Sequence, residues 1–215
     1  MPEGYYYVKE LDAGEKHDLN TTMYGFHFHT TDNEKIKHID LNDSKVINNK
    51  LHENELSFKK INEVATLVSG KGYSYAITGN AAGAIFELLD ADKKVIQTIT
   101  VGKDSIGSIK HLPVGTFYLR ESKPSATNLV LSKETLKLVS TKDGVTVFDS
   151  KDKQIGETKA DTKKPTIAFE LTNELIKDTG ELTKTDVSTG KRLPNTSIRI
   201  LDENGKTVVS GRTDK

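Results

Sequence analysis

The sequence predicts an all-β protein built from repeated units, and three observations support this prediction. The 215-residue chain is rich in Thr, Val and Ile, which favour strands over helices. Many short stretches alternate apolar and polar residues with the two-residue period of a half-buried strand. Similar segments also recur along the chain, and internal repeats of this kind indicate an array of like domains.

The predicted strands are separated by clusters of turn-forming residues. No stretch carries a long helical stripe of apolar side chains. Asp, Asn, Gly and Lys gather at 90–94, 141–144 and 202–206, which are predicted turns. Residues 64–82, rich in Gly, Ser and Ala, are expected to form an inserted loop or an irregular hairpin. The predicted strands lie at 24–30, 84–89, 117–121, 145–148 and 167–171.

The clearest repeat ends in a glutamate. The segment MPEGYYYVKE at 1–10 aligns without gaps with LPVGTFYLRE at 112–121, so Glu10 corresponds to Glu121. A second pair of similar segments, GAIFELLD and NTSIRILD, begins at residues 83 and 195. Both segments read as strands.

A third repeat joins an asparagine to a lysine. Asn49 precedes Lys60 by the same spacing at which Asn173 precedes Lys184. The residues around the two lysines are also similar. One unit therefore contains, in order, a lysine, a strand of G-A-x-F type, a strand ending in glutamate, and an asparagine.

The order of these elements predicts where the units begin and end. Residues 1–50 hold the glutamate and asparagine elements and form the C-terminal half of a unit. Residues 51–177 hold all four elements and form one complete unit. Residues 178–215 hold the lysine and the next strand, the N-terminal half of a further unit.

Composition excludes several classes of function. The 31 Lys and Arg balance 31 Asp and Glu, which argues against a nucleic-acid groove or an anionic membrane surface as the main partner. The chain has no Cys, which excludes disulfides, thiolate metal sites and a cysteine nucleophile. No apolar run approaches the roughly 20 residues that span a bilayer. The first residues show no charged-then-apolar leader.

The four ordered elements resemble the Cna-B domains (SpaA-like, prealbumin-like) of Gram-positive surface proteins and pilins. The family's K-x-[DN] strand matches Lys60–Asn62, and its G-A-x-F-x-L strand matches Gly83–Leu88. Its L-x-x-G-x-[YF]-x-[LV]-x-E motif matches Leu112–Glu121, and its last strand matches Phe169–Asn173. The resemblance implies tandem immunoglobulin-like (prealbumin-like) β-sandwiches, one complete and two partial.

The resemblance also implies an autocatalytic isopeptide bond between Lys60 and Asn173, with Glu121 as the acid and proton shuttle. Burial disfavours the charge of a lysine and leaves a nucleophilic amine. A buried Glu121 is expected to stay protonated and to donate to the amide oxygen of Asn173. In the partial units, Glu10 and Asn49 correspond to Glu121 and Asn173 but have no lysine, and Lys184 corresponds to Lys60 but has no glutamate or asparagine.

Two alternatives to this crosslink remain open at the level of the sequence. The same three residues could form a buried Lys–Glu ion pair with an asparagine at a strand end. Lys59 competes with Lys60, although alternation places the two on opposite faces of the sheet, and the parallel with Lys184 favours Lys60.

Two further patterns are predicted to be incidental. The segment 193–197, LPNTS, is similar to a sortase sorting signal but continues directly into a predicted strand. His27 and His29 share a strand face without a third metal ligand nearby, so no metal site is expected. Any cell-wall anchor is expected beyond Lys215.

These observations favour a structural stalk or shaft repeat of a cell-wall-anchored adhesin or pilin outside the cell. The alternative is an adhesin module that itself binds a host matrix protein. No cofactor is expected, and the only chemistry would be a single self-crosslinking event, not an enzyme's turnover. The expected partners are neighbouring repeats of the same protein, with host extracellular matrix as a further candidate, and neither nucleic acid nor membrane insertion is expected.

Overall fold

The computed structural model describes residues 2–28, 48–68, 71–160 and 166–214. Within these ranges all regular structure is β-strand, and the strands form several sheets. The predicted all-β class is therefore confirmed. No helix in the described ranges is long and apolar enough to cross a membrane.

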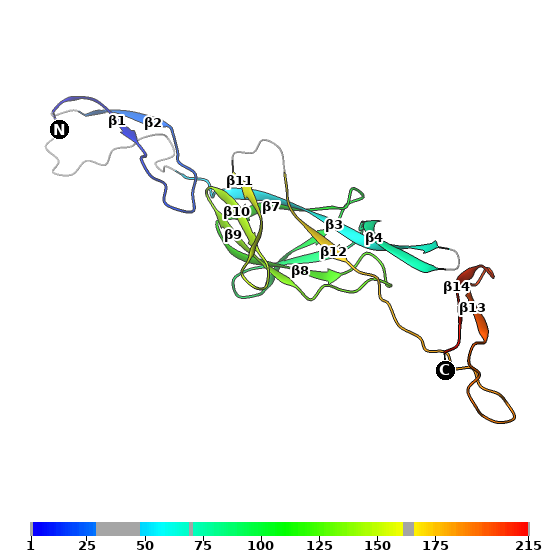
Figure 1. Ribbon diagram of the computed structural model, residues 1–215. Coiled ribbons are helices and arrows are strands. Elements are labelled where there is room, and N and C mark those ends of the chain that lie inside the picture. Colours follow the sequence, from blue (N-terminus) through cyan, green and yellow to red (C-terminus); the bar gives the residue numbers. More distant parts are fainter. Residues whose placement is uncertain (1, 29–47, 69–70, 161–165, 215) are drawn as a thin grey trace.

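The strands fall into three groups along the chain (Figure 1). A hairpin near the N-terminus comprises β1 (Gly4–Lys9) and β2 (Met23–Phe28), and another near the C-terminus comprises β13 (Ser197–Leu201) and β14 (Thr207–Arg212). The central unit contains the remaining strands, which are β3 (Glu53–Val68), β4 (Gly72–Asn80), β5 (Ile85–Leu89), β6 (Val95–Thr100), β7 (Ile106–Pro113), β8 (Gly115–Lys123), β9 (Thr135–Thr141), β10 (Gly144–Phe148), β11 (Gln154–Lys159) and β12 (Ile167–Asn173).

The central unit is a sandwich of two sheets. One sheet has six strands in the order β11-β10-β9-β8-β5-β6, and the other places β3 between β12 and β4, with β7 also pairing β3. Neighbouring strands are antiparallel except for β3 and β12, which run parallel, with Lys60 opposite Leu171 and Asn62 opposite Asn173. The first and last strands of the central unit are therefore hydrogen-bonded neighbours.

Alternation along the strands builds the core between the two sheets. On β3 the inward residues Leu56 and Phe58 are almost fully buried, as are Phe86 on β5 and Leu119 on β8. Gly107 on β7 leaves room for Phe58, because a Cβ at residue 107 would lie 2.3 Å from the Phe58 ring. The middle of the core is apolar, and the inward positions become polar toward its ends, with Asn54 and Ser140 at one end and Lys60, Glu121 and Asn173 at the other.

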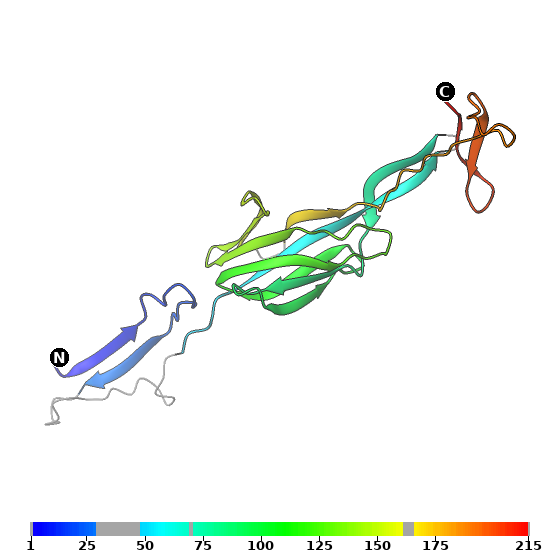
Figure 2. The same ribbon diagram turned by 90° about the horizontal axis from the view of Figure 1, so that it is seen from below.

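Within the predicted loop or irregular hairpin at 64–82, the described residues 64–68 and 72–80 form two regularly paired strands. β3 and β4 pair from Val68–Gly72 down to Ile61–Asn80, with one register shift at residues 62–63. Beyond the sandwich this two-stranded arm projects toward β13 and β14 (Figure 2). The Gly, Ser and Ala of this segment favoured a loop in the sequence, although Tyr73, Tyr75 and Ile77 on β4 alternate with smaller residues as in a strand.

Candidate functional site

Three polar residues follow core-facing apolar residues on three strands of the sandwich. Lys60 follows Leu56 and Phe58 on β3, and its side chain is fully buried. Glu121 on β8 and Asn173 at the end of β12 are likewise buried, with 5% and 2% of their surface exposed. The two-residue period of the strands carries all three side chains into the core.

The three side chains contact one another inside the sandwich. The Nζ atom of Lys60 donates to Oδ1 of Asn173. The Nδ2 atom of Asn173 donates to Oε1 of Glu121 at 2.9 Å, and the same oxygen lies 3.5 Å from Nζ of Lys60. Residues 113 positions apart in the sequence thus meet at one carboxylate.

The surroundings of Lys60 favour its neutral amine. Burial lowers the pKa of Lys60 below its ordinary value, and the nearby Glu121 opposes this shift only in part. The ring of Phe86 lies 5.6 Å from Nζ, and Phe58 and Phe169 stack beside it with centroids 5.4 Å apart. These aromatic side chains exclude water from the amine.

Glu121 is held by both of its oxygens. Oε1 accepts from Asn173, and Oε2 accepts from the backbone N–H of Ser132 at 2.9 Å. Glu121 therefore contacts the amide nitrogen of Asn173 and not, as the resemblance implied, the amide oxygen. The role of Ser132 was missed, because a backbone donor leaves no side-chain signature.

This arrangement suits an acyl transfer from asparagine to lysine. The amine of Lys60 can attack Cγ of Asn173, forming the Nζ–Cγ bond and breaking the Cγ–Nδ2 bond. Glu121 lies between the attacking and leaving nitrogens, so it can take a proton from one and deliver it to the other, releasing ammonia. Fixed proximity in the core raises the effective concentration of the amine.

Lys59 lies on the opposite face of β3. Its side chain is 41% exposed and its Nζ is 3.7 Å from Glu170, its neighbour on β12. The two strands therefore carry an exposed Lys–Glu pair on one face and the buried cluster on the other.

Residues 1–50 repeat the glutamate–asparagine contact. Asn49 donates through Nδ2 to Oε1 of Glu10 at 2.6 Å, and the backbone N–H of Asn20 donates to Oε2 at 2.7 Å. This pattern matches the contacts of Glu121 with Asn173 and Ser132. The described part of residues 1–50 brings no lysine into this contact.

The segments that follow Asn49 and Asn173 form equivalent β-bridges. His17 forms an antiparallel bridge with Leu51, and Leu129 forms one with Leu175. Backbone hydrogen bonds of 2.8–2.9 Å flank both bridges. The chain that leaves each asparagine is thus joined to the loop after the glutamate strand.

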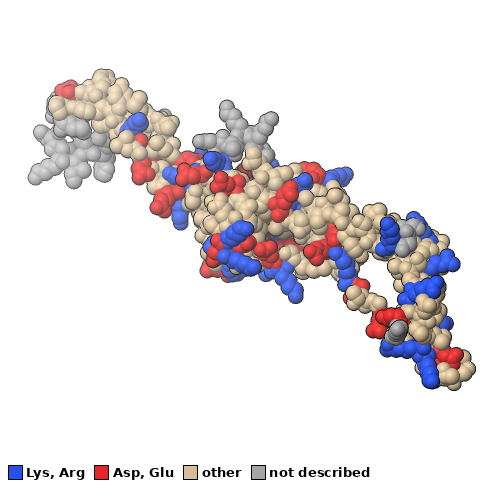
Figure 3. Space-filling view, in the orientation of Figure 1, with Lys and Arg blue, Asp and Glu red and all other residues tan. Residues whose placement is uncertain are grey.

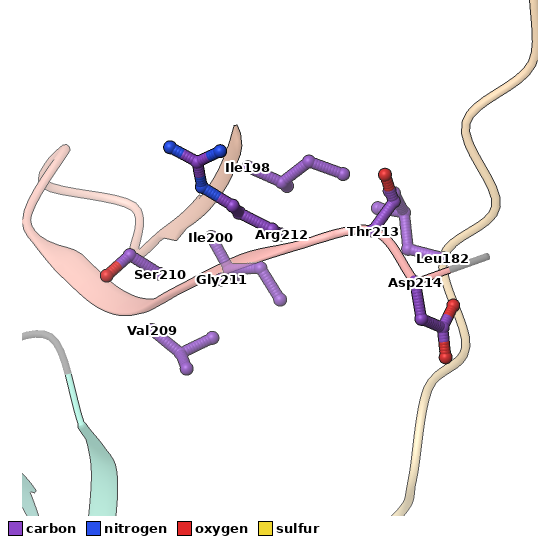
Figure 4. A pocket seen from close by; sticks show the side chains of 9 residues that line it. All are labelled: Leu182, Ile198, Ile200, Val209, Ser210, Gly211, Arg212, Thr213 and Asp214. Atoms are coloured by element: carbon purple, nitrogen blue, oxygen red, sulfur yellow. The ribbon is translucent and has the colours of Figure 1, made fainter. Parts of the chain in front are cut away.

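The C-terminal hairpin resembles β5 and β6 of the central unit. Asn195 adopts the positive φ that Gly83 has at the corresponding position, 60° against 87°. Ile198 and Ile200 correspond to the buried Phe86 and Leu88, but they line an open pocket together with Leu182 and Val209 (Figure 4). Lys184 lies outside this hairpin and is exposed, without a Glu–Asn pair beside it.

The two patterns set aside in the sequence have ordinary surroundings. Ser197 and the residues after it form β13, as predicted for the LPNTS segment. His27 packs against Tyr5 with ring centroids 4.3 Å apart, and His29 lies outside the described residues. Among the described residues no group of three His, Asp or Glu side chains could hold a metal ion.

Comparison with known proteins identifies the class of the central unit. Residues 77–165 match the model of the SpaA family, a prealbumin-like fold domain. Residues 77–165 are therefore similar to a SpaA-type, prealbumin-like domain, which is a structural and non-enzymatic class of domain. The predicted family resemblance is confirmed over residues 77–165, which include the G-A-x-F strand and the motif that ends in Glu121. No curated protein sequence matches the chain.

One of the solved structures to which the chain is similar shares its fold. The Bacillus anthracis TIE protein is 20% identical with a TM-score of 0.59, covering all of this chain and 33% of that one. The chain thus spans about a third of the length of that protein. Two streptococcal proteins align less well. The group B streptococcus pilus 2b backbone protein has 18% identity and a TM-score of 0.35 over 71% of this chain and 48% of that chain. GBS52, the minor pilin of Streptococcus agalactiae, has 16% identity and a TM-score of 0.36 over 86% and 65%.

Proposed function

We propose that this chain is part of the stalk of a Gram-positive cell-wall-anchored adhesin or pilin, and that an isopeptide bond between Lys60 and Asn173 locks its central unit. The observation that carries the proposal is the contact of a fully buried lysine with an asparagine amide, both beside one buried carboxylate. Glu121 is the proton shuttle of this single reaction. The family of the central unit supports the surface location.

The buried-ion-pair alternative fits the geometry less well. An ion pair alone needs only Lys60 and Glu121, yet their nearest atoms are 3.5 Å apart, whereas both bond to the Asn173 amide. Taking a charged lysine and a charged glutamate out of water costs free energy that an ion pair alone often does not repay. Stability is therefore a weak reason to keep these groups in the core. A covalent product removes the amine charge altogether.

We further propose that residues 1–50, 51–177 and 178–215 are consecutive units of one array. The Glu10–Asn49 contact supports the first as a C-terminal half, and the open pocket of Ile198 and Ile200 supports the last as an N-terminal half. The expected partners are neighbouring units of the same kind. Acidic and basic side chains alternate over the visible face of the central unit, as suits a stalk with no polyanionic ligand (Figure 3).

The mass of the intact chain tests the crosslink. The purified protein should be lighter than its sequence mass by one ammonia, and proteolysis should yield one branched peptide joining Lys60 to Asn173. A Glu121→Ala variant should have the full mass. An unmodified mass for the folded wild-type protein would contradict the proposal.

A further inference from the structure

The β3–β4 arm is an insertion of the central unit. The stretch of chain from Lys60 to Gly83 is about twice as long as the corresponding stretch from Lys184 to Asn195. The additional residues do not fold back onto the sandwich. They extend β3 and β4 past the end of the core, toward the C-terminal unit (Figures 1 and 2).

The tip of the arm pairs with the following unit. Lys71, beside the tip, forms an antiparallel bridge with Val209 of β14. The other edge of β14 pairs with β13, where Ile200 lies opposite Val209. The arm therefore covers a strand edge that the hairpin alone would leave open, and an uncovered edge readily pairs with other chains.

The base of the arm holds the connecting segment. Oε2 of Glu63 accepts the backbone N–H of Leu175 at 2.9 Å, and Nζ of Lys177 lies 2.8 Å from both carboxylate oxygens. The ammonium of Lys177 also lies 4.3 Å from the centre of the Tyr75 ring on β4. The first residues after β12 are thus bound to the arm. Hydrogen bonds to Lys177 and Leu175 lower the pKa of Glu63, which keeps its carboxylate charged.

We propose that the β3–β4 arm, bridged to Val209 at its tip and bound to Leu175 and Lys177 by Glu63 at its base, is a brace that fixes the direction of the next unit. Its partner is the open edge of β14 in the following repeat. Two domains joined by a short linker otherwise move relative to each other. The brace would make this joint stiff, a property whose value to the protein rests on the proposed stalk role.

Distance measurements between spin labels can test the brace in the full chain, because the protein has no native Cys. One label is placed at Thr98→Cys on β6 and the other at Arg199→Cys on β13, both exposed positions. A control pair uses Thr98→Cys with Thr21→Cys, which spans the other joint. In the wild-type background the 98–199 pair should give a narrow distance distribution.

Shortening the arm is the decisive variant. Residues 65–75 are replaced by Asn-Gly, a two-residue turn suited to joining the paired positions Val64 and Ala76. The 98–199 distribution should broaden roughly twofold as the joint loosens, and the 98–21 distribution should stay unchanged. An unchanged 98–199 width would overturn the proposal. Equal broadening of both pairs would also count against it, because it would signal a damaged central unit.

A point variant tests the base of the brace. Glu63→Gln removes the charge that holds Lys177, and the 98–199 distribution should broaden less than in the shortened arm. The matched control is Glu87→Gln, whose ion pair with Arg120 is also 2.8 Å but lies within the six-stranded sheet. Equal widths for these two variants would exclude a role for Glu63. The ammonia loss should persist in all of them, so failure of the brace and failure of the crosslink are separate results.

Discussion

Pulling on the two ends of the chain should extend the wild-type central unit far less than a Glu121→Gln variant. The substitution preserves the size of the side chain but removes the carboxylate between Lys60 and Asn173. Without the proton shuttle the bond should not form. The load then falls on the hydrogen bonds between β3 and β12 and on the core.

The structure sets the size of this difference. Force enters the central unit through β3 and leaves through β12, and the proposed crosslink between Lys60 and Asn173 would lie on this path. At about 3.3–3.6 Å per residue, the 113 residues between Lys60 and Asn173 contain about 370–410 Å of chain. In the wild type this length is bypassed, whereas in the variant all of it becomes extensible once the unit unfolds.

Single-molecule force spectroscopy measures the difference directly. When the variant unfolds, its contour length should increase by the chain length between Lys60 and Asn173, less the distance between these residues in the folded unit. The wild type should lack this step. Glu170→Gln, which alters the exposed partner of Lys59 on the same pair of strands, should behave as wild type. A full-length increment in the wild type would refute the reasoning, because the force would not be passing through a covalent bond.

Four further predictions concern stability and pH. Loss of the loop closed by the crosslink in Glu121→Gln should cost about 5 kcal/mol on the disulfide analogy, or roughly 15–25 °C in Tm measured by calorimetry; an unchanged Tm would argue against the bond. In Asn173→Ala the free, buried Lys60 amine has a lowered pKa. Between this folded value and 10.5 the unfolded state therefore binds more protons than the folded state. Urea unfolding should therefore show stability rising with pH toward the ordinary value of 10.5, and a flat profile would contradict this. Glu63 at the base of the arm has a pKa lowered by its hydrogen bonds with Lys177 and Leu175, and Lys177 in turn faces Glu174 and Tyr75. The contribution of Glu63 should be complete above pH 4.5 and lost as pH falls through the lower folded value, seen as broadening of the 98–199 label distances; broadening that begins above pH 4.5 would argue against it. Gly107→Ala should destabilise the central unit by about 1–3 kcal/mol in denaturant melts, because the new Cβ collides with the Phe58 ring, and a neutral result would show that β7 can shift.

The fold class and the three residues of the candidate site were both predictable from the sequence. Lys60, Glu121 and Asn173 were selected because the ordered elements of the repeat resemble Cna-B domains. Strand alternation placed Lys59 and Lys60 on opposite faces, and the parallel with Lys184 favoured Lys60 as the inward residue. The strands at 84–89, 117–121 and 145–148 were found because each faces a core on one side. Such residues show the two-residue period clearly.

Other features were missed, some of them because they leave no pattern in the sequence. On the β3–β4 arm, Tyr73, Tyr75 and Ile77 alternate with smaller residues as in a strand, but the Gly, Ser and Ala of the segment favoured a loop, and all three large side chains are exposed. The hydrogen bond from Ser132 to Glu121 uses a backbone N–H, which any residue could supply. The contact of Glu63 with Lys177 joins residues 114 positions apart and has no counterpart in the first repeat. The predicted unit boundaries stay predictions.

The bridges His17–Leu51 and Leu129–Leu175 carry a consequence for molecules longer than this chain. Each bridge joins the residues that leave a unit to a loop of that same unit. The chain to the next unit therefore starts from an equivalent position in both cases. In the proposed array, appending more copies would lengthen the molecule unit by unit from the same starting point, whereas the turn at each joint would depend on whether the unit before it carries an arm like β3–β4.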